Sequence, residues 1–212
     1  VLARIAEVRV RGEAGPNRAA LLARIAQLQA LDPLNERAAE RILLLAGDIP
    51  GLDIQLALRP AGTTPGHAFE WARLAVQAWD LDGRRDGDLL DWARALYHQA
   101  RADGWRAGDG SIVYTVDQQG RVLRDNRYWW PVTEAIGTAA ALIKAGDDLQ
   151  ADYAEYWSGA RAHFVDEERG GWYPDLHRDG VQFTGKPDIY HSIQAVLFPL
   201  VPEISRISHA LA

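Results

Sequence analysis

Two histidines and two glutamates occur near the beginnings of segments that have helical spacing. The four residues are His67 and Glu70, in the stretch PGHAFEWARL (65–74), and Glu134 and His191 farther along the chain. Each of them follows a proline within five residues, and proline is favoured in the first turn of a helix. Imidazoles exchange protons near neutral pH, and carboxylates orient them or bind hydroxyl groups. The pattern predicts a proton-transfer site built from the N-terminal ends of several helices.

The first turn of a helix also provides an electrostatic setting for this chemistry. Its unpaired N–H groups and partial positive charge push an imidazole toward the neutral form that a general base needs, and they favour a developing oxyanion. The rings of Trp71, Trp129 and Trp130 could form the walls of such a site, because aromatic faces stack on the C–H groups of sugars. A histidine in a first turn is, however, more often a surface residue, and a tryptophan more often belongs to the core.

The same two histidines and two glutamates could instead be arranged as a metal site. No single helix supplies the His-x-x-x-His or Glu-x-x-His pair that usually anchors such a site, so we expect no metal. The sequence also has no cysteine, which excludes disulfides, thiolate metal sites and a thiol nucleophile.

Helical spacing dominates the chain, and strand signals are confined to connections. The segments expected to be helices are 17–31, 35–47, 67–81, 87–104, 131–146, 149–166, 188–200 and 202–211. Two small hairpins are expected between helices, over residues 111–123 with a turn at Gly120 and over residues 171–183 with a turn at Asp179-Gly180.

The order of these elements repeats. Trp105 and Trp172, each of which precedes a hairpin and then a helix, lie 67 residues apart. Repeated helix pairs that cannot bury their apolar faces alone predict a stacked or circular arrangement. In a circle the second helices of the pairs line the inside, and their N-terminal ends gather at one mouth. No linker interrupts the chain, so residues 1–212 are expected to form a single domain.

Composition limits the classes of partner. The formal net charge of −6 provides no basic surface for phosphates, which makes nucleic acid and anionic membranes unsuitable partners. No apolar run approaches the roughly 20 residues of a membrane span. The first fifteen residues carry arginines and acids throughout, unlike a secretory signal, so a cytoplasmic protein is expected.

Four stretches together resemble a known family. They are TTPGHAFEWARL (63–74), RYWWPVTEAIGTAAAL (127–142), DEERGGWYPDLHRDG (166–180) and KPDIYHSIQAVLFP (186–199). In combination they resemble the N-acylglucosamine 2-epimerase superfamily, and within it they are most similar to the mannose and sulfoquinovose aldose–ketose isomerases. The resemblance implies an all-α fold, an (α/α)6 barrel of helix pairs with short β-hairpins in the connections. It also implies sugar isomerisation through a cis-enediolate, with neither a metal nor a nucleotide as cofactor.

The resemblance assigns roles residue by residue. His67 is similar to the general base that removes the proton next to the carbonyl, and His191 is similar to the second acid–base group. Glu70 and Glu134 resemble the acids that position the histidines and bind hydroxyl groups. Arg59 is similar to an arginine on the substrate side. The expected sugar-binding residues are Arg59, Trp71, Trp130 and Asp188.

The chain departs from the family pattern in its length. Six units of the observed repeat would need roughly 400 residues, and 212 are present. An Asn-x-His-Met stretch, which supplies another active-site histidine in the family, has no counterpart, and residues 47–62 are short against the family. The barrel is therefore expected to be incomplete, and an open barrel exposes apolar helix faces that favour a homodimer.

Three other functions remain open at this point. A 2-epimerase of the same superfamily would return the proton to the opposite face of the same carbon. A non-catalytic member would bind a carbohydrate or a protein without turnover. A glycoside hydrolase on the same barrel would use Glu70 and Glu134 as its acid pair and would need neither histidine.

Overall fold

A computed structural model gives the fold of the chain, and it describes residues 5, 8–31, 34–54, 62–176, 187 and 189–205. The chain divides into two compact units, Val1–Ala61 and Gly62–Ala212. The expectation that residues 1–212 form a single domain stays a prediction.

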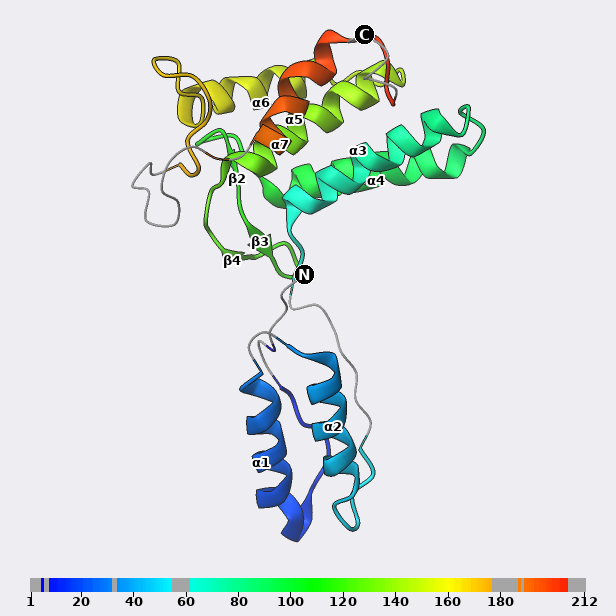
Figure 1. Cartoon of the computed structure of the whole chain (residues 1–212), viewed down its shortest axis with the longest axis vertical. Coiled ribbons are helices and arrows are strands. Elements are labelled where there is room, and N and C mark those ends of the chain that lie inside the picture. Colours follow the sequence, from blue (N-terminus) through cyan, green and yellow to red (C-terminus); the bar gives the residue numbers. More distant parts are fainter. Residues whose placement is uncertain are drawn as a thin grey trace. The chain divides into compact units, whose positions relative to one another are not determined.

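The first unit contains a pair of helices, α1 (Arg18–Gln29) and α2 (Glu36–Gly47), which lie side by side (Figure 1). A short 3-10 helix, η1 (Gly15–Asn17), precedes α1. The side chain of Asn35 caps α2 by accepting a hydrogen bond of 3.0 Å from the backbone N–H of Ala38. Both helices were expected from the spacing of their apolar residues, and their bounds agree with the expected segments within two residues.

The second unit holds five helices and carries the candidate site. They are α3 (Pro65–Leu81), α4 (Gly87–Gly104), α5 (Trp129–Lys144), α6 (Gln150–His163) and α7 (Ile189–Leu197), which continues into the 3-10 helix η2 (Phe198–Leu200). Helix α5 packs against α3, α6 and α7, and α3 also packs against α4 (Figure 1). Thirteen of the sixteen residues of α5 are buried, so α5 is the centre of this unit.

Seven of the expected helices are therefore present, with small differences at their ends. Helix α3 begins at Pro65, two residues before the expected start, because proline fits the first helical position, where its missing N–H is not needed. Thr64 is the residue before this helix, and its side chain makes no capping hydrogen bond. The eighth helix, expected over 202–211, is wrong for residues 202–205, none of which is helical; residues 206–211 lie outside the described part.

Two small hairpins connect α4 to α5. Strands β1 (Trp105–Arg106) and β2 (Ser111–Ile112) pair antiparallel, and so do β3 (Thr115–Val116) and β4 (Val122–Arg124). The second pair confirms a hairpin that turns at Gly120, whose φ of +74° suits glycine. The expected hairpin over 111–123 begins too early, because Ser111 and Ile112 pair with β1, which precedes them in the chain.

The other expected hairpin, over residues 171–183, falls largely outside the described residues. Its described beginning makes two isolated bridges, from Trp172 to Val165 and from Asp175 to Tyr128. The second bridge joins the segment after α6 to the residue before α5. It therefore helps to hold the start of α5 in place.

The core of the second unit is built around aromatic residues that fix α3. The ring of Phe69 meets the rings of Tyr97 and Tyr156 edge to face, with centroid distances of 5.5 and 5.9 Å. All three side chains are fully buried. Because Phe69 lies in the second turn of α3, this cluster sets the rotation of that helix about its own axis.

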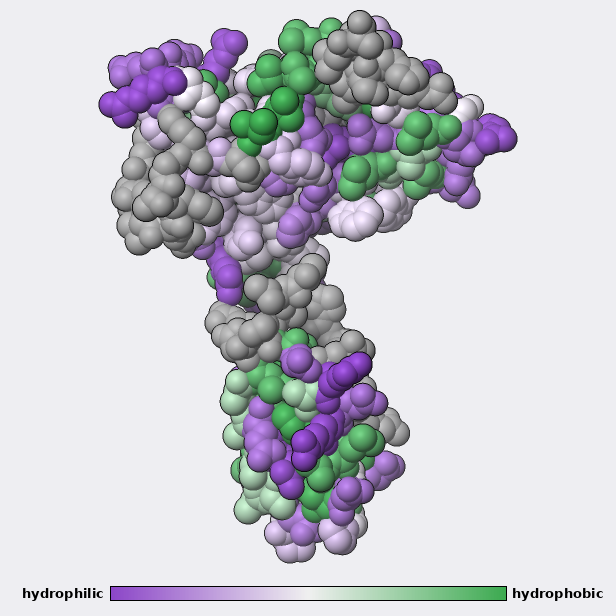
Figure 2. Space-filling view, in the orientation of Figure 1, coloured by the Kyte–Doolittle hydropathy of each residue, from purple (hydrophilic) through white to green (hydrophobic). Residues whose placement is uncertain are grey.

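Apolar side chains remain exposed on the two helices that flank α5. On α7 and η2 they are Ile189, Tyr190, Ile193, Val196 and Leu200, where Figure 2 shows a strongly hydrophobic surface. On α3 they are Trp71, Leu74 and Leu81. Exposed apolar faces were expected for an incomplete barrel. Among the helices with described residues, none is long and apolar enough to cross a membrane.

Candidate functional site

The buried carboxylate of Glu134 and the ring of His191 form the closest pair in the candidate site. Glu134 lies in the second turn of α5, and its side chain is 1% exposed. Its Oε1 lies 2.7 Å from Nδ1 of His191, which is on α7 and 20% exposed. One ring nitrogen of His191 is thus engaged by Glu134, and the other nitrogen is left for a different partner.

Arg73 of α3 binds the other oxygen of the same carboxylate. Its Nε donates a hydrogen bond of 2.9 Å to Oε2 of Glu134, and its Nη1 donates one of 3.1 Å to Oε1 of Gln77. Its side chain is only 3% exposed. Gly137 of α5 makes room for it, since a Cβ there would stand 3.2 Å from Cδ of Arg73.

Sequence reasoning missed Arg73. A signal was present, because Arg73 falls between Ala72 and Val76 on the face of α3 that also carries Phe69, and these three neighbours are fully buried. A charged residue on the apolar face of a helix must find a partner in the core. The sequence did not say which acid that partner would be.

Trp130 brings the two histidines into one neighbourhood. Its ring centroid lies 5.0 Å from that of His67 and 5.4 Å from that of His191. The two imidazole centroids are therefore within about 10 Å of each other. His67 is exposed and Trp130 is half-buried, so this part of the site is open to solvent.

The glycine between Pro65 and His67 has a steric reason. A Cβ on Gly66 would stand 2.6 Å from Cζ3 of Trp130, well inside van der Waals contact. Only glycine lets the first turn of α3 approach the indole ring this closely. The stretch Pro-Gly-His thus starts the helix, admits Trp130 and presents an imidazole beside it.

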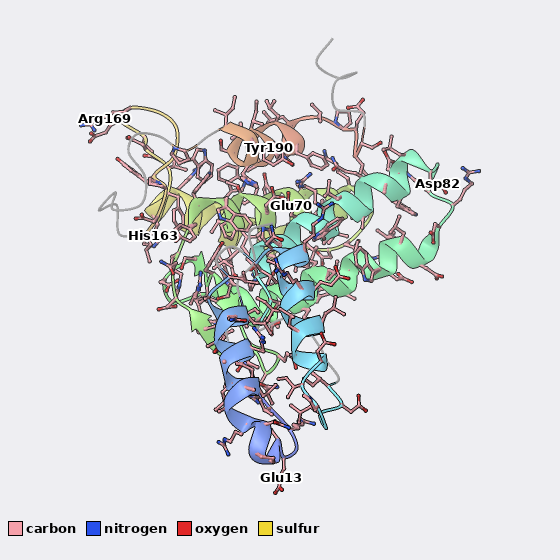
Figure 3. The ribbon with its side chains drawn as sticks, turned by 60° about the horizontal axis from the view of Figure 1, so that its bottom comes forward. Glu13, Glu70, Asp82, His163, Arg169 and Tyr190 are labelled. Carbon is pink, nitrogen blue, oxygen red and sulfur yellow. The ribbon has the colours of Figure 1, made fainter. Side chains whose placement is uncertain are left out.

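Glu70 and Trp71 share the face of α3 that carries His67, because residues three and four positions apart on a helix are neighbours. Glu70 is half-buried, and Trp71 is 59% exposed. Figure 3 shows Glu70 near the beginning of α3 and Asp82 just beyond the opposite end of the same helix. The other two predicted sugar-binding residues, Arg59 and Asp188, lie outside the described residues.

A large hollow of the second unit lies elsewhere. It has a volume of about 710 Å³, and it runs between α6 and the end of α7, with Tyr153, Trp157 and Leu200 in its lining. None of the predicted catalytic residues lines it. Within the described part of the chain, no three His, Cys, Asp or Glu side chains are grouped as they would be to hold a metal ion. The roles assigned to the four catalytic candidates stay predictions.

Comparison with known proteins gives a consistent picture. The sequence profile described as N-acylglucosamine 2-epimerase (GlcNAc 2-epimerase) matches residues 17–195. Two proteins named D-mannose isomerase are similar in sequence: one from Pseudomonas cannabina pv. alisalensis, 39% identical over 165 residues, and one from Thermobifida fusca, 37% identical over 162 residues. Each match covers 73% of this chain and 40% of the relative, so the chain spans about two fifths of the length of these relatives.

Solved structures agree at the level of the fold. A crystal structure of D-mannose isomerase matches 87% of this chain and 56% of its own, with a TM-score of 0.58 and 24% identity. The cellobiose 2-epimerase of Spirochaeta thermophila DSM 6192 matches 83% of this chain and 47% of its own, with a TM-score of 0.54 and 19% identity. The mostly helical fold of the (α/α)6 barrel type, expected from the sequence, is confirmed, and about half of such a barrel is covered.

Proposed function

Because this chain belongs to the N-acylglucosamine 2-epimerase family, we propose that it is part of a sugar isomerase that interconverts a mannose-like aldose and its ketose. One observation carries the proposal: two imidazoles from different helices lie beside the same indole ring, and one of them is paired with a buried carboxylate. The sequence relatives named D-mannose isomerase support the choice of substrate class.

The reaction needs two proton transfers, and the site offers a group for each. His67, exposed at the start of α3, removes the proton from C2 of the open-chain aldose, and the released electron pair forms the C1–C2 double bond of a cis-enediolate. His191 then acts as the second acid–base group, moving protons at the two oxygens. Return of the carbon-bound proton to C1 gives the ketose. These steps use only imidazoles and carboxylates, so they call for no metal or nucleotide.

Trp130, Glu70 and Trp71 would hold the sugar for these steps, whereas both oxygens of Glu134 are already bound by Arg73 and His191. The indole ring between the two imidazoles offers an apolar face for the C–H groups of a sugar. Glu70 and Trp71 lie on the same face of α3 as His67 and would bind hydroxyl groups and the ring. Arg59 and Asp188 complete this proposed set from the sequence resemblance alone.

A 2-epimerase is the second candidate, and the name of the matching family profile favours it. An epimerase would use the same two imidazoles, but the proton would return to the opposite face of C2. The difference between the two outcomes depends on where the second acid–base group stands relative to C1 and C2.

The test is incubation of the protein with D-mannose in D2O, followed by product analysis. The isomerase proposal expects fructose, whereas an epimerase gives glucose that carries deuterium at C2. Absence of any turnover of mannose, its close epimers and sulfoquinovose would overturn both. In that case sugar binding that survives in the His67→Ala and His191→Ala variants would indicate a non-catalytic member.

We further propose a cytoplasmic protein that forms a homodimer and whose only substrate partner is a small sugar. The exposed apolar side chains of α3 and α7 support association, because such surfaces are costly to leave in water. Sedimentation velocity checks the oligomeric state, and a monomer at micromolar concentration would contradict this part.

A further inference from the structure

With a neutral imidazole, the hydrogen bond between Glu134 and His191 can exist in two forms, which differ in the tautomer of the ring and by one proton on the carboxyl group. In one form a carboxylate accepts from Nδ1–H of the imidazole, and in the other a carboxylic acid donates to a bare Nδ1. A neutral imidazole has one donor nitrogen and one acceptor nitrogen, so Nε2 carries a free lone pair in the first form and a hydrogen in the second. The distance of 2.7 Å between Oε1 and Nδ1 fits both.

Burial alone does not favour the carboxylate form. The side chain of Glu134 is 1% exposed, and removal from water disfavours the charged state of a carboxyl group. A second group is therefore needed to decide which form is present. The only partner that the structure gives to the other oxygen, Oε2, within the described residues is Arg73.

Arg73 can act in only one way on this carboxyl group. Its guanidinium group has donors and no acceptor, and it stays protonated in proteins. An acid proton on Oε2 would point at the N–H of Nε, which stands 2.9 Å away. The side chain of Arg73 is only 3% exposed, and its positive charge also favours the ionised carboxylate of Glu134. Glu134 is then an acceptor on both oxygens, and Nδ1 of His191 must carry the hydrogen.

The packing around Arg73 keeps its guanidinium group beside the carboxylate of Glu134. Thr138 of α5 donates a hydrogen bond of 2.7 Å, shared between the backbone carbonyls of Phe69 on α3 and Glu134 on α5. This shared hydroxyl aligns the two helices at the level where Arg73 and Glu134 meet. Gly137 leaves space for the stem of Arg73, and Gln77 accepts from its Nη1.

Arg73 also lowers the stability of the folded state in a way that an apolar residue at this position would not. Its Nη2 is buried and has no hydrogen-bond partner in the described structure. An unpaired buried donor destabilises the folded state, whereas an apolar side chain of similar size would fill the same space without that penalty. A charge kept at this cost is better explained by its effect on Glu134 than by stability.

We propose that Arg73 is a positioning residue that selects the tautomer of His191, by holding Glu134 as an acceptor so that the proton sits on Nδ1 and the lone pair on Nε2. The meaning for catalysis rests on the proposed isomerase function, in which Nε2 is the atom that exchanges protons with the sugar. The tautomer itself does not depend on that function, because Arg73 acts through Glu134 and not on the substrate.

The first experiment measures the tautomer directly. The full 212-residue chain is labelled with ¹⁵N-histidine, and two-bond ¹H–¹⁵N correlations are recorded at a pH where the rings are neutral. Six histidines contribute signals, and those of His191 are the ones lost in His191→Asn. The native protein is expected to show Nδ1–H at His191. Arg73→Met is expected to lose at least half of this population, and an unchanged Nδ1–H signal in a folded Arg73→Met protein overturns the proposal.

A second variant covers the case in which Arg73→Met does not fold. In Glu134→Gln the guanidinium of Arg73 requires an oxygen acceptor, so the amide NH2 turns toward His191 and Nδ1 becomes an acceptor. The expected result is a nearly complete switch to Nε2–H. Retention of Nδ1–H in Glu134→Gln would show that Arg73 does not control the orientation of the side chain at position 134, and it would overturn the proposal.

The matched control is Arg94→Met. Arg94 of α4 forms an ion pair of 2.9 Å with Asp147 in the connection between α5 and α6, and the partners of its side chain include neither Glu134 nor His191. Its loss is expected to leave the signals of His191 unchanged, and a similar shift in this variant would mark the effect of Arg73→Met as non-specific. If the tautomer behaves as expected and no sugar is turned over, only the proposed function fails.

Discussion

Oε1 of Glu134 lies 2.7 Å from Nδ1 of His191, although the two residues are 57 positions apart and belong to helices α5 and α7. The opposite oxygen of the same carboxylate is bound by Arg73 from α3. One buried carboxylate therefore joins all three helices that surround the candidate site.

Loss of either imidazole should remove the proposed activity. We expect His67→Ala and His191→Ala each to lower kcat for mannose isomerisation by at least about 100-fold, the usual contribution of a general acid or base. His98 is exposed on α4 and makes an edge contact with Tyr97, so His98→Ala is the control and should keep its kcat. Equal losses in all three variants would contradict the assignment.

Removal of the Glu134 carboxylate should destabilise the protein strongly. Glu134→Ala leaves the charge of Arg73 buried and unpaired, which costs about 3–5 kcal/mol in the free energy of unfolding. Arg94→Met breaks an ion pair that is partly exposed, and its cost should be about 1 kcal/mol or less. Urea unfolding of both variants checks this, and equal costs would contradict the argument that burial makes the unpaired charge of Arg73 costly.

Gly66→Ala should disturb the contact between α3 and Trp130. The added Cβ would stand 2.6 Å from the indole ring, and we expect a loss of about 1–3 kcal/mol in the free energy of unfolding, with weaker sugar binding. The control is Gly47→Ala at the end of α2, where no atom lies within 4 Å of the new Cβ and helix propensity favours alanine. Thermal unfolding distinguishes the two; equal stability of both variants would contradict the steric argument.

Alkaline pH should destabilise the second unit through its buried tyrosines. Burial raises the pKa of Tyr156 to about 12, and burial followed by the neighbouring Tyr156 raises the pKa of Tyr97 as well. An unfolded tyrosine ionises near pH 10. Above that pH the unfolded chain binds fewer protons than the folded chain, so the stability that these tyrosines contribute is present below about pH 10 and falls as the pH rises toward 12.

Urea unfolding between pH 9 and 12 measures this dependence. Tyr156→Phe removes a hydrogen bond of 3.3 Å to Tyr97, which lowers stability at neutral pH by about 1 kcal/mol. It should also make the decline above pH 10 shallower, by up to about 2–3 kcal/mol at pH 12. A decline that is equally steep in Tyr156→Phe would show that this phenol does not contribute to it.

Local sequence patterns were enough to predict most of the helices and where they begin. Apolar spacing and the prolines at residues 65, 131 and 187 act within a few turns of the chain, so the helices that carry His67, Glu134 and His191 could be predicted with errors of about two residues at most starts. The turn at Gly120 was predicted for the same reason. The family resemblance also came from such local motifs.

Which of these residues meet depends on packing between segments that are far apart in the sequence. Nothing within a few positions of Glu134 shows that it is fully buried, that Arg73 binds it from 61 residues away, or that it faces His191. The pairing of Ser111 and Ile112 with β1 could not be predicted from the local sequence either. Local patterns depend on neighbours along the chain, whereas these contacts depend on how each helix is rotated and how far it is shifted against the next. Those quantities are set by packing between distant segments, such as that of Phe69 against Tyr97 and Tyr156.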